Sequence, residues 1–563
     1  MREFAPAPPA NEWVGDWSAR RARLSPEKVG LVDATSGAEF TYAELDERAN
    51  RTARLLRERS VDRGDRVAVV SRNRPELVDL FFATGKLGAV LAPLSHRLAP
   101  PELAELLDAV DAALLVVEDE FADLVGDGAG DSGGEPAAEL AAGDAGTLPD
   151  GLVVGDDAES VAGAAADLAG EAADDVDGWA DALPADGSPV ERPDVAMDDP
   201  HLFLHTGGST GVPKETIIPH RAVLWNSFNT ITAWGLRPED ATPMTFPMFH
   251  TGGWNVITVP LFHLGGTVVI ARDFDAGEVL GIVDERDASV LVAVPAVLRM
   301  MADHGDWPDT DLSSLRVAKS GGGPCRGSVI DAWRERGVDL SQGYGLTECG
   351  PNNFSMPDGW DREKTDAVGV PAMHVDARVV DGDGDPLPDG EVGELELSGP
   401  HAADGYWRNP AESGATFGAR SDGATDGDDG SADAGGDAAG WVSTGDLARV
   451  DADGYYHIEG REKNMFVSGG ENVYPPEVED VLADHPAVDD VVVVGVPNEE
   501  WGTVGLAVVE GDESLTLAAL REFCDGRLAR FKHPRDLAFV GGLPTSGPSK
   551  IDRVAVRERF GDG

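Results

Sequence analysis

A glycine-rich segment in the first half of the chain carries residue types that can bind phosphate. It reads Leu204-His205-Thr206-Gly207-Gly208-Ser209-Thr210-Gly211-Val212-Pro213-Lys214. Glycines and small hydroxyl side chains let backbone N–H groups approach phosphate oxygens, and Lys214 adds a positive charge. The segment differs from the common P-loop, which ends in Gly-Lys-Ser/Thr, because it ends in Pro-Lys-Glu. Taken alone, the pattern fits an ordinary glycine-rich turn equally well.

A second motif places an aromatic ring, a hydroxyl and a carboxylate within six residues, Gly343-Tyr344-Gly345-Leu346-Thr347-Glu348. Tyr344 can stack on a purine, and Thr347 can form a hydrogen bond with a phosphate. Glu348 offers the hard oxygen ligands that Mg²⁺ prefers. As an isolated hexapeptide, the segment is better interpreted as a turn between a strand and a loop.

Two further motifs follow toward the C-terminus. Ser443-Thr444-Gly445-Asp446 precedes Gly460-Arg461-Glu462-Lys463, and Pro544-Thr545-Ser546-Gly547-Pro548-Ser549-Lys550-Ile551 presents one lysine. An aspartate that accepts two hydrogen bonds is suited to hold the two hydroxyls of a ribose. These residue types are therefore compatible with a nucleotide site.

The elements that must position these motifs begin with alternating strands and helices. Apolar runs at 29–34, 67–70, 87–94 and 113–117 indicate strands. Thr41 and Glu44 form a capping box for a helix whose apolar residues recur at helical spacing. Pro75 suits the first turn of the next helix. This order predicts an α/β fold with a largely parallel sheet.

After Arg461 the pattern changes to helix at 475–482, strands at 488–496 and 505–509, and helix at 517–530. A chain of 563 residues is too long for one core. We therefore predict a large α/β N-terminal domain with mixed and parallel sheets over residues 1–460. A small, mobile α+β C-terminal domain should follow over 461–563.

Two stretches rich in Ala, Gly, Asp and Glu interrupt this order, at 118–194 and 411–440. Their composition suggests that neither buries much apolar surface. We expect both to be acidic, partly disordered surface insertions without a function.

The composition limits the classes of partner and the compartment. A net charge of −57 repels phosphate backbones, which argues against nucleic acids and anionic membranes, and it resembles cytosolic proteins of halophilic archaea. No apolar run is long enough to span a bilayer, and the N-terminus lacks the layout of a signal peptide. The three cysteines form no C-x-x-C pair. We expect a cytoplasmic protein.

Together, the ordered motifs resemble the adenylate-forming superfamily of acyl-CoA synthetases, carrier-loading adenylation domains and beetle luciferases, over about residues 40–553. The phosphate-loop match is close, and Tyr344-Gly345-Leu346-Thr347-Glu348 and Thr444-Gly445-Asp446 match without change. Further matches are Pro247-Met248-Phe249-His250 for the acyl pocket, Ser320-Gly321-Gly322-Gly323-Pro324 beside adenine, and Gly460-Arg461-Glu462-Lys463 with Gly469-Gly470-Glu471-Asn472-Val473-Tyr474-Pro475 at the hinge.

The resemblance implies how ATP is bound. The β- and γ-phosphates would be held by Thr206, Gly207, Gly208, Ser209, Thr210, Gly211 and Lys214. The α-phosphate and Mg²⁺ would be bound by Thr347 and Glu348, with Glu348 as the metal ligand. The ribose and adenine would be contacted by Asp446, Arg461, Gly322, Gly323 and Tyr344.

The resemblance also implies the catalytic residues. Lys550 would bridge the substrate carboxylate and the α-phosphate during adenylation, and Thr347 and Glu348 would act with it. Lys463 occupies the hinge about which the small domain rotates between the two half-reactions.

The chain departs from the family pattern at three positions. Glu215 replaces a glycine directly after the loop lysine, where a carboxylate is unfavourable unless it points away or meets Lys214. Ser549 replaces the glycine before Lys550, which adds strain if that position needs a positive φ. Gly207 replaces a serine and removes one hydroxyl donor.

The region after His250 bears on the identity of the acid. In the bacterial fatty acyl-CoA synthetases that this region resembles, a tryptophan four residues after the motif histidine gates the acyl tunnel, and Trp254 has that spacing. A core tryptophan is an equally good interpretation, and His250 could be a satisfied buried histidine. Gly252 and Gly253 would leave room for a bulky or long acyl group.

The resulting hypothesis is an acid–thiol ligase that uses ATP, Mg²⁺ and coenzyme A. Its first-choice substrate is a medium- or long-chain fatty acid, and an aryl acid of the benzoate or coumarate type comes second. A stand-alone enzyme that loads a carrier protein is a further alternative, as is a nucleotide-binding protein without catalysis. The expected partners are small molecules, and the oligomeric state is open, with a homodimer among the options.

Overall fold

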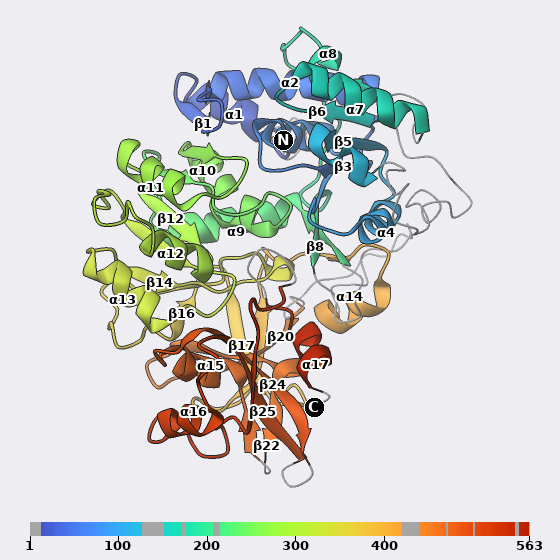
Figure 1. The fold of residues 1–563 in the computed structure, drawn as a ribbon. Coiled ribbons are helices and arrows are strands. Elements are labelled where there is room, and N and C mark those ends of the chain that lie inside the picture. The colour runs from blue at the N-terminus through green and yellow to red at the C-terminus, as the bar shows by residue number, and fades with distance from the viewer. Residues whose placement is uncertain are drawn as a thin grey trace, which may run out of the picture.

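The computed structural model describes residues 13–125, 151–171, 176–206, 214–418, 440–468, 471–498, 502–545 and 551–561. These residues form five sheets, and Figure 1 colours the chain from the blue N-terminal end to the red C-terminal end. In the described part of the chain, no helix has the combination of length and apolar character that a bilayer crossing requires.

The largest sheet has eight strands in the order β19-β9-β8-β4-β3-β5-β6-β7. The strands are β3 (Arg66–Val70), β4 (Val90–Leu94), β5 (Leu114–Glu118), β6 (Gly151–Val154), β7 (Val176–Gly178), β8 (Pro200–Thr206), β9 (Lys214–Pro219) and β19 (Gly405–Tyr406). The pairs from β8 to β7 are parallel, whereas β9 runs antiparallel to both β8 and β19.

Both faces of this sheet are buried, as expected for parallel strands covered by helices. Along β3, Val67 and Val69 enter one core and Ala68 and Val70 enter another. The first core also receives residues of α2 (Tyr42–Glu58) and α3 (Pro75–Leu87), and the second receives residues of α4 (Pro100–Val110) and α7 (Ala158–Glu171). The capping box of Thr41 and Glu44 at the start of α2 is confirmed.

There are also two smaller sheets, one of which joins blue N-terminal strands to green ones, while the other comes from the green and yellow part of the chain (Figure 1). One contains β1 (Val29–Asp33), β2 (Glu39–Thr41), β10 (Ala241–Pro243) and β11 (Thr267–Ile270). The other is parallel and contains β12 (Val290–Ala293), β13 (Val317–Ser320) and β14 (Leu340–Gln342). The helices of this region are α9 (His220–Trp234), α10 (Thr258–Leu264), α11 (Ala276–Glu285), α12 (Pro295–Ala302) and α13 (Gly327–Glu335).

An antiparallel sheet of six strands follows in the order β15-β16-β21-β20-β18-β17. Its strands are β15 (Phe354–Ser355), β16 (Ala367–Pro371), β17 (Asp376–Val380), β18 (Gly393–Ser398), β20 (Val442–Val450) and β21 (Tyr456–Arg461). The helix α14 (Pro410–Phe417) precedes β20.

The C-terminal part begins where β21 ends and has a sheet of its own. This sheet contains β22 (Phe466–Ser468), β23 (Glu471–Val473), β24 (Val488–Asn498), β25 (Gly502–Gly511) and β26 (Asp536–Phe539). Its helices are α15 (Pro475–Ala483), α16 (Leu517–Cys524) and α17 (Arg553–Phe560). The α/β N-terminal domain with mixed sheets and the small α+β C-terminal domain are therefore confirmed as fold class, although the helix expected at 517–530 already ends at Cys524.

The expectation that 118–194 buries little apolar surface is wrong for part of that stretch. Gly151–Val154 forms β6, which pairs in parallel with β5, and β7 pairs in parallel with β6. Leu152 and Val153 are fully buried, and α7 packs Ala165 and Leu168 into the core. The average composition of the stretch hid these short apolar runs, and the segments 126–150 and 419–439 lie outside the described residues.

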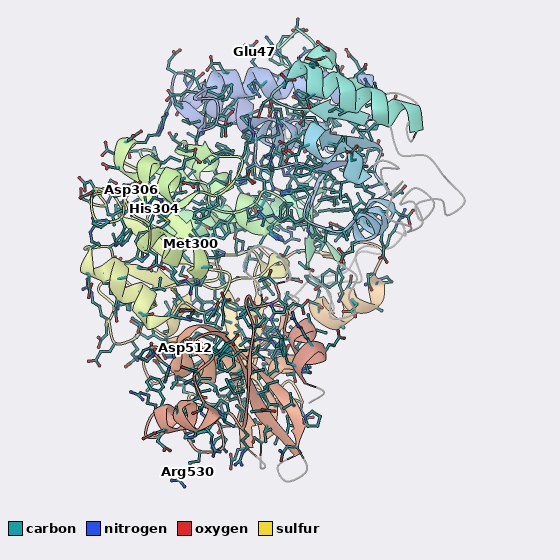
Figure 2. All side chains as sticks on the ribbon, viewed as in Figure 1. Glu47, Met300, His304, Asp306, Asp512 and Arg530 are labelled. Atoms are coloured by element: carbon teal, nitrogen blue, oxygen red, sulfur yellow. The ribbon has the colours of Figure 1, made fainter. Side chains whose placement is uncertain are left out.

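The acidic residues labelled in Figure 2 lie at the molecular surface. Glu47 projects from α2, and Asp306 and Asp512 lie in exposed turns. Their carboxylates remain hydrated, so they impose little desolvation penalty on the fold.

Candidate functional site

The β20–β21 pair brings three of the sequence-predicted residues together. Asp446 and Arg461 are directly opposite in the register, and they form an ion pair in which Arg461 Nε lies 2.8 Å from Asp446 Oδ1. Tyr344, which follows β14, donates its hydroxyl to Asp446 Oδ2 at 2.6 Å. Each carboxylate oxygen has a second lone pair, so Asp446 can still accept hydrogen bonds from a ligand.

The backbone around Asp446 is held by its own motif. Gly445 has φ +67°, a left-handed conformation that glycine adopts without strain. Thr444 Oγ1 accepts from Asp446 N at 3.1 Å and donates to Leu395 O at 2.7 Å. Burial and the negative charge of Asp446 raise the pKa of Tyr344 well above its ordinary value, so its hydroxyl remains a donor.

A second cluster surrounds the ends of the phosphate loop. Thr206 and Lys214 face each other across β8 and β9, and Thr206 Oγ1 lies 3.5 Å from Lys214 O. Lys214 Nζ pairs with Glu412 Oε2 at 2.5 Å and lies 5.2 Å from the centre of the Tyr406 ring. The Tyr406 hydroxyl in turn donates to Glu348 Oε1 at 2.7 Å, which links Lys214 to the predicted metal ligand.

Tyr406 and Glu412 were missed by the sequence analysis. Burial and the charge of Glu348 raise the pKa of Tyr406, so the phenol stays protonated. Both residues lie in the segment after β18, where no phosphate or metal motif marks them. Their role becomes visible only because β19 pairs with β9.

The carboxylate of Glu348 suits a magnesium ion. Tyr406 donates to one of its oxygens, which leaves the other to act as a hard ligand. The described residues contain no group of three or more His, Cys, Asp and Glu side chains that could hold a metal by themselves. A magnesium ion at Glu348 would therefore take its remaining ligands from water and phosphate oxygens, which is its usual mode of binding.

Lys463 lies in the short turn Glu462–Asn464 that joins the last strand of the large domain to β22. Burial lowers its pKa, and the positive charges of Arg461 and Lys214 act in the same direction. The predicted hinge lysine therefore lies close enough to the site for its charge to act on these two residues.

The adenine-side loop leaves the carboxyl end of β13. Gly321 N donates to Ala293 O at 3.0 Å, and Gly343 N donates to Ser320 O at 2.7 Å, so three parallel strands present their ends together. Gly322 has φ +84° and is exposed, as is Gly323. A binding site at the carboxyl ends of parallel strands is the usual arrangement in α/β folds.

Glu215 points away from the phosphate loop rather than toward Lys214. It is 3% exposed, it faces His205 across the β8–β9 pair, and neither carboxylate oxygen has a hydrogen-bond partner among the described residues. Burial raises its pKa to about 8, so the side chain is protonated at neutral pH. A neutral acid repels neither the phosphates nor the loop.

We expect Glu215→Gln to remove a pH dependence of stability. The unfolded chain releases the Glu215 proton above about pH 4.3, whereas the folded protein keeps it up to about pH 8. Within that window, the free energy of unfolding should fall by about 1.4 kcal/mol per pH unit because of this residue. Urea unfolding of both proteins between pH 5 and 9 measures the difference. The exposed Glu513→Gln is the control and should keep the wild-type slope; equal slopes for all three proteins would contradict the protonated state.

His250 and Trp254 lie in different surroundings. The ring of His250 is half-buried and lies 4.5 Å from Phe249 and 5.6 Å from His205, between centroids. Trp254 is fully buried, stacks on Phe81 with centroids 5.1 Å apart, and donates Nε1–H to Met248 O at 2.6 Å. Of the two interpretations of Trp254, the structure favours core packing over a gate.

The room expected beside Gly252 and Gly253 is absent. A Cβ at Gly252 would lie 2.7 Å from the Phe246 ring, and one at Gly253 would lie 2.5 Å from Pro247 O. Both glycines permit close packing in a turn of π-helix, 252–256, so they give no support for a long acyl tunnel.

Replacing Trp254 with alanine should therefore lower the free energy of unfolding by about 3–5 kcal/mol, as expected for a large buried side chain. If the chain has the acid-activating function that its resemblance implies, its order of preference among acids should not change, because the side chain belongs to the core. Urea unfolding and relative kcat/KM values for an acid panel measure the two effects. Trp225→Ala is the control, since Trp225 is only half-buried and should cost less. A changed order of preference among acids, with little loss of stability, would instead support the interpretation that Trp254 gates an acyl tunnel.

Some predicted residues lie outside the described part of the chain. They are Gly207, Gly208, Ser209, Thr210, Gly211, Ser549 and Lys550. Thr347, which is described, is half-buried in the turn Thr347–Cys349 next to Glu348.

Comparison with known proteins gives two family matches and many relatives. The model described as AMP-binding enzyme matches residues 18–407, and the AMP-binding enzyme C-terminal domain matches residues 477–550. A feruloyl-CoA synthase of Amycolatopsis sp. is 35% identical over 98% of this chain and 100% of its own length. A long-chain-fatty-acid–CoA ligase of Mycobacterium tuberculosis is 30% identical over 97% of this chain and 98% of its own.

A solved structure shares the fold over nearly the whole chain. It is an anthranilate CoA ligase in complex with anthranoyl-AMP, with a TM-score of 0.80 and 25% identity. The match covers 97% of this chain and 96% of that one. Both domains therefore have counterparts in a protein whose structure holds an acyl-adenylate.

Proposed function

This chain belongs to the family of AMP-binding enzymes, and we propose that it is an AMP-forming acid–thiol ligase that joins a carboxylic acid to coenzyme A through an acyl-adenylate. The observation that carries the proposal is the Asp446 carboxylate, bonded by Tyr344 and Arg461. An aspartate held in this way suits the two hydroxyls of a ribose, and Tyr344 supplies an aromatic ring for adenine.

In the first half-reaction, an acid carboxylate attacks the α-phosphorus of ATP and pyrophosphate leaves. Both reactants are anions, so cations must offset their repulsion and the charge that develops in the transition state. Lys214 lies at the end of the phosphate loop, and the positive charges of Lys214 and Lys463 act on each other. We assign both to this task, together with Lys550. Glu348 would hold Mg²⁺, which neutralises phosphate charge when bound.

In the second half-reaction, the thiol of coenzyme A attacks the acyl carbonyl and AMP leaves. At this stage Asp446, oriented by Tyr344 and Arg461, would still bind the ribose of the AMP moiety. AMP can leave only when its hydrogen bonds to Asp446 break. The cluster of Asp446, Tyr344 and Arg461 would therefore act in both half-reactions.

We favour an aryl acid over a fatty acid as the substrate. The feruloyl-CoA synthase is more similar to this chain than the fatty-acid ligase, at 35% against 30% identity over nearly equal lengths. The close packing of Gly252 and Gly253 also removes the reason to expect space for a long chain at that point. A medium- or long-chain fatty acid remains the second candidate, because the fatty-acid ligase still matches over 97% of the chain.

Incubation with ATP, Mg²⁺ and a panel of aryl and fatty acids tests the proposal. Release of pyrophosphate should depend on the acid, and acyl-CoA should form only when coenzyme A is added. Adenylate that accumulates with coenzyme A but transfers to a phosphopantetheinylated carrier protein would identify a carrier-loading enzyme instead. Tight ATP binding without acid-dependent pyrophosphate would contradict catalysis altogether.

A further inference from the structure

Lys319 is a buried lysine that the functions assigned above do not use. It belongs to β13, directly before the adenine-side loop that starts at Ser320, and it is 8% exposed. No carboxylate among the described residues forms an ion pair with it, and the nearest acidic influence, Asp339, acts only through its more distant charge. A buried ammonium without an ion pair is unfavourable, because it has lost its hydration.

The side chain of Lys319 lies on the face of the three-stranded sheet that is opposite the helices α12 and α13. Along β13, Ala318 packs into the core formed with α12 and α13, whereas Val317 packs into the main core on the opposite face. Because side chains alternate along a strand, Lys319 shares the face of Val317. On that face its Nζ lies 5.8 Å from the centre of the Trp234 ring, at the end of α9.

The surroundings of Lys319 connect the two halves of the proposed site. Ser320 O, one residue away, accepts from Gly343 N and so fixes the start of the Tyr344 motif. On the other side, Lys319 lies opposite Val292 of β12, and Val292 O accepts from Thr245 Oγ1 at 2.5 Å. Thr245 opens the segment that leads to His250. Lys319 is therefore placed between the nucleotide loops and the segment assigned to the acyl group.

Two neighbours favour the charged form of this buried amine. Burial lowers the pKa of Lys319 to about 8, and Asp339 opposes that shift. The Trp234 ring provides partial compensation, since an ammonium is attracted to an aromatic face. A cation that forms no ion pair with a described carboxylate, between the nucleotide loops and the segment assigned to the acyl group, is suited to bind an anion of the substrate.

We propose that Lys319 selects acids that carry a second anionic oxygen, a carboxylate or an ionised phenol, at the end of the acyl group remote from the reacting carboxylate. This inference rests on the proposed ligase function and specifies its substrate class. The ε-ammonium would donate to the second oxygen in a site from which water is excluded. A charged hydrogen bond of that kind is among the stronger ones in proteins.

Matched pairs of acids measure the selection. ATP–pyrophosphate exchange is compared for terephthalate and 4-methylbenzoate, for 4-carboxycinnamate and 4-methylcinnamate, and for suberate and octanoate. The wild-type protein should give a higher kcat/KM for the doubly acidic member of at least one pair. Lys319→Met, which keeps the length of the side chain without its charge, should lower that ratio on the order of 10- to 100-fold. Lys364→Met is the control, because Lys364 pairs with Asp451 and Asp453 at the surface and should leave the ratio unchanged.

A second readout separates specificity from folding. The shift in melting temperature caused by the preferred double acid, without ATP, should be smaller for Lys319→Met than for the wild type, and Lys319→Arg should retain part of it. Exchange that favours the singly charged acids in every pair, or a ratio that Lys319→Met does not change, would overturn the role of Lys319 and leave the ligase proposal intact. No exchange with any acid would overturn the ligase proposal and this inference together.

Discussion

Replacing Asp446 with alanine should lower kcat/KM for ATP by at least about 10²-fold, because two charged hydrogen bonds of roughly 1.5–3 kcal/mol each are lost with the ribose. The mutation also leaves Tyr344 and Arg461 without the carboxylate that now orients both. Steady-state kinetics with saturating acid and varied ATP measure the effect. The comparison of ATP with 2′,3′-dideoxy-ATP isolates its cause, since the wild type should prefer ATP strongly and the variant should not.

The control for Asp446 is another buried aspartate that pairs with an arginine. Asp240 is 3% exposed, and Arg316 Nη2 lies 2.6 Å from its Oδ2, outside the proposed site. Asp240→Ala should lower the stability of the fold but keep the preference for ATP over the dideoxy analogue. If Asp446→Ala keeps that preference as well, the carboxylate does not bind the ribose.

The site residues that sequence could predict are those in short motifs at element ends. Asp446 and Arg461 were identified from the order of the motifs. They lie opposite each other because β20 and β21 are consecutive antiparallel strands. Tyr344 joins them because it follows the last strand of a small parallel sheet, and parallel strands present their carboxyl ends together. Local signals such as the Thr41 capping box were equally reliable, since they depend only on neighbouring residues.

Sequence could not predict contacts that depend on pairing between distant segments. Tyr406 reaches Glu348 only because β19 adds to the edge of the large sheet beside β9. β6 was hidden for the same reason, because four residues at 151–154 become core only through pairing with β5. Trp254 was ambiguous because a gate and a core position have the same spacing from His250. Its burial, its stacking on Phe81 and its bond to Met248 O favour the core position, and the first two of these depend on distant segments.

A single short turn joins the sheet of the large domain to the sheet of the small domain. The chain leaves β21 at Arg461, passes through the turn that contains Lys463, and enters a different sheet. Beyond this turn, the contacts between the described residues of the two parts include polar ones. Arg326 of the large domain forms an ion pair with Asp490, and Arg299 Nη1 donates to Asp489 O at 3.2 Å. We expect the small domain to rotate about this turn, and these two contacts would have to break for it to do so.

Replacing Lys550 with alanine should slow adenylate formation on the order of 10²- to 10³-fold, as when one preorganised donor is removed from a site that stabilises developing charge. The lysine itself lies outside the described residues, but Thr545 and Ile551, which flank its loop, pair as an antiparallel bridge of the small domain. We therefore expect its loop to move with that domain. Thioester formation from a supplied acyl-adenylate and coenzyme A should be far less affected, because rotation about Lys463 would have carried Lys550 away from the reacting atoms.

The two half-reactions must be measured separately, by pyrophosphate exchange and by single-turnover thioester formation. Lys532→Ala is the matched control, because Lys532 is another lysine of the small domain whose ammonium pairs with Glu477, at 2.5 and 2.6 Å from its two oxygens. That variant should change both half-reactions equally, and by much less. An equal large loss in both half-reactions for Lys550→Ala would mean that the residue supports the fold or both conformations, and rotation about Lys463 would no longer explain how one site carries out two reactions.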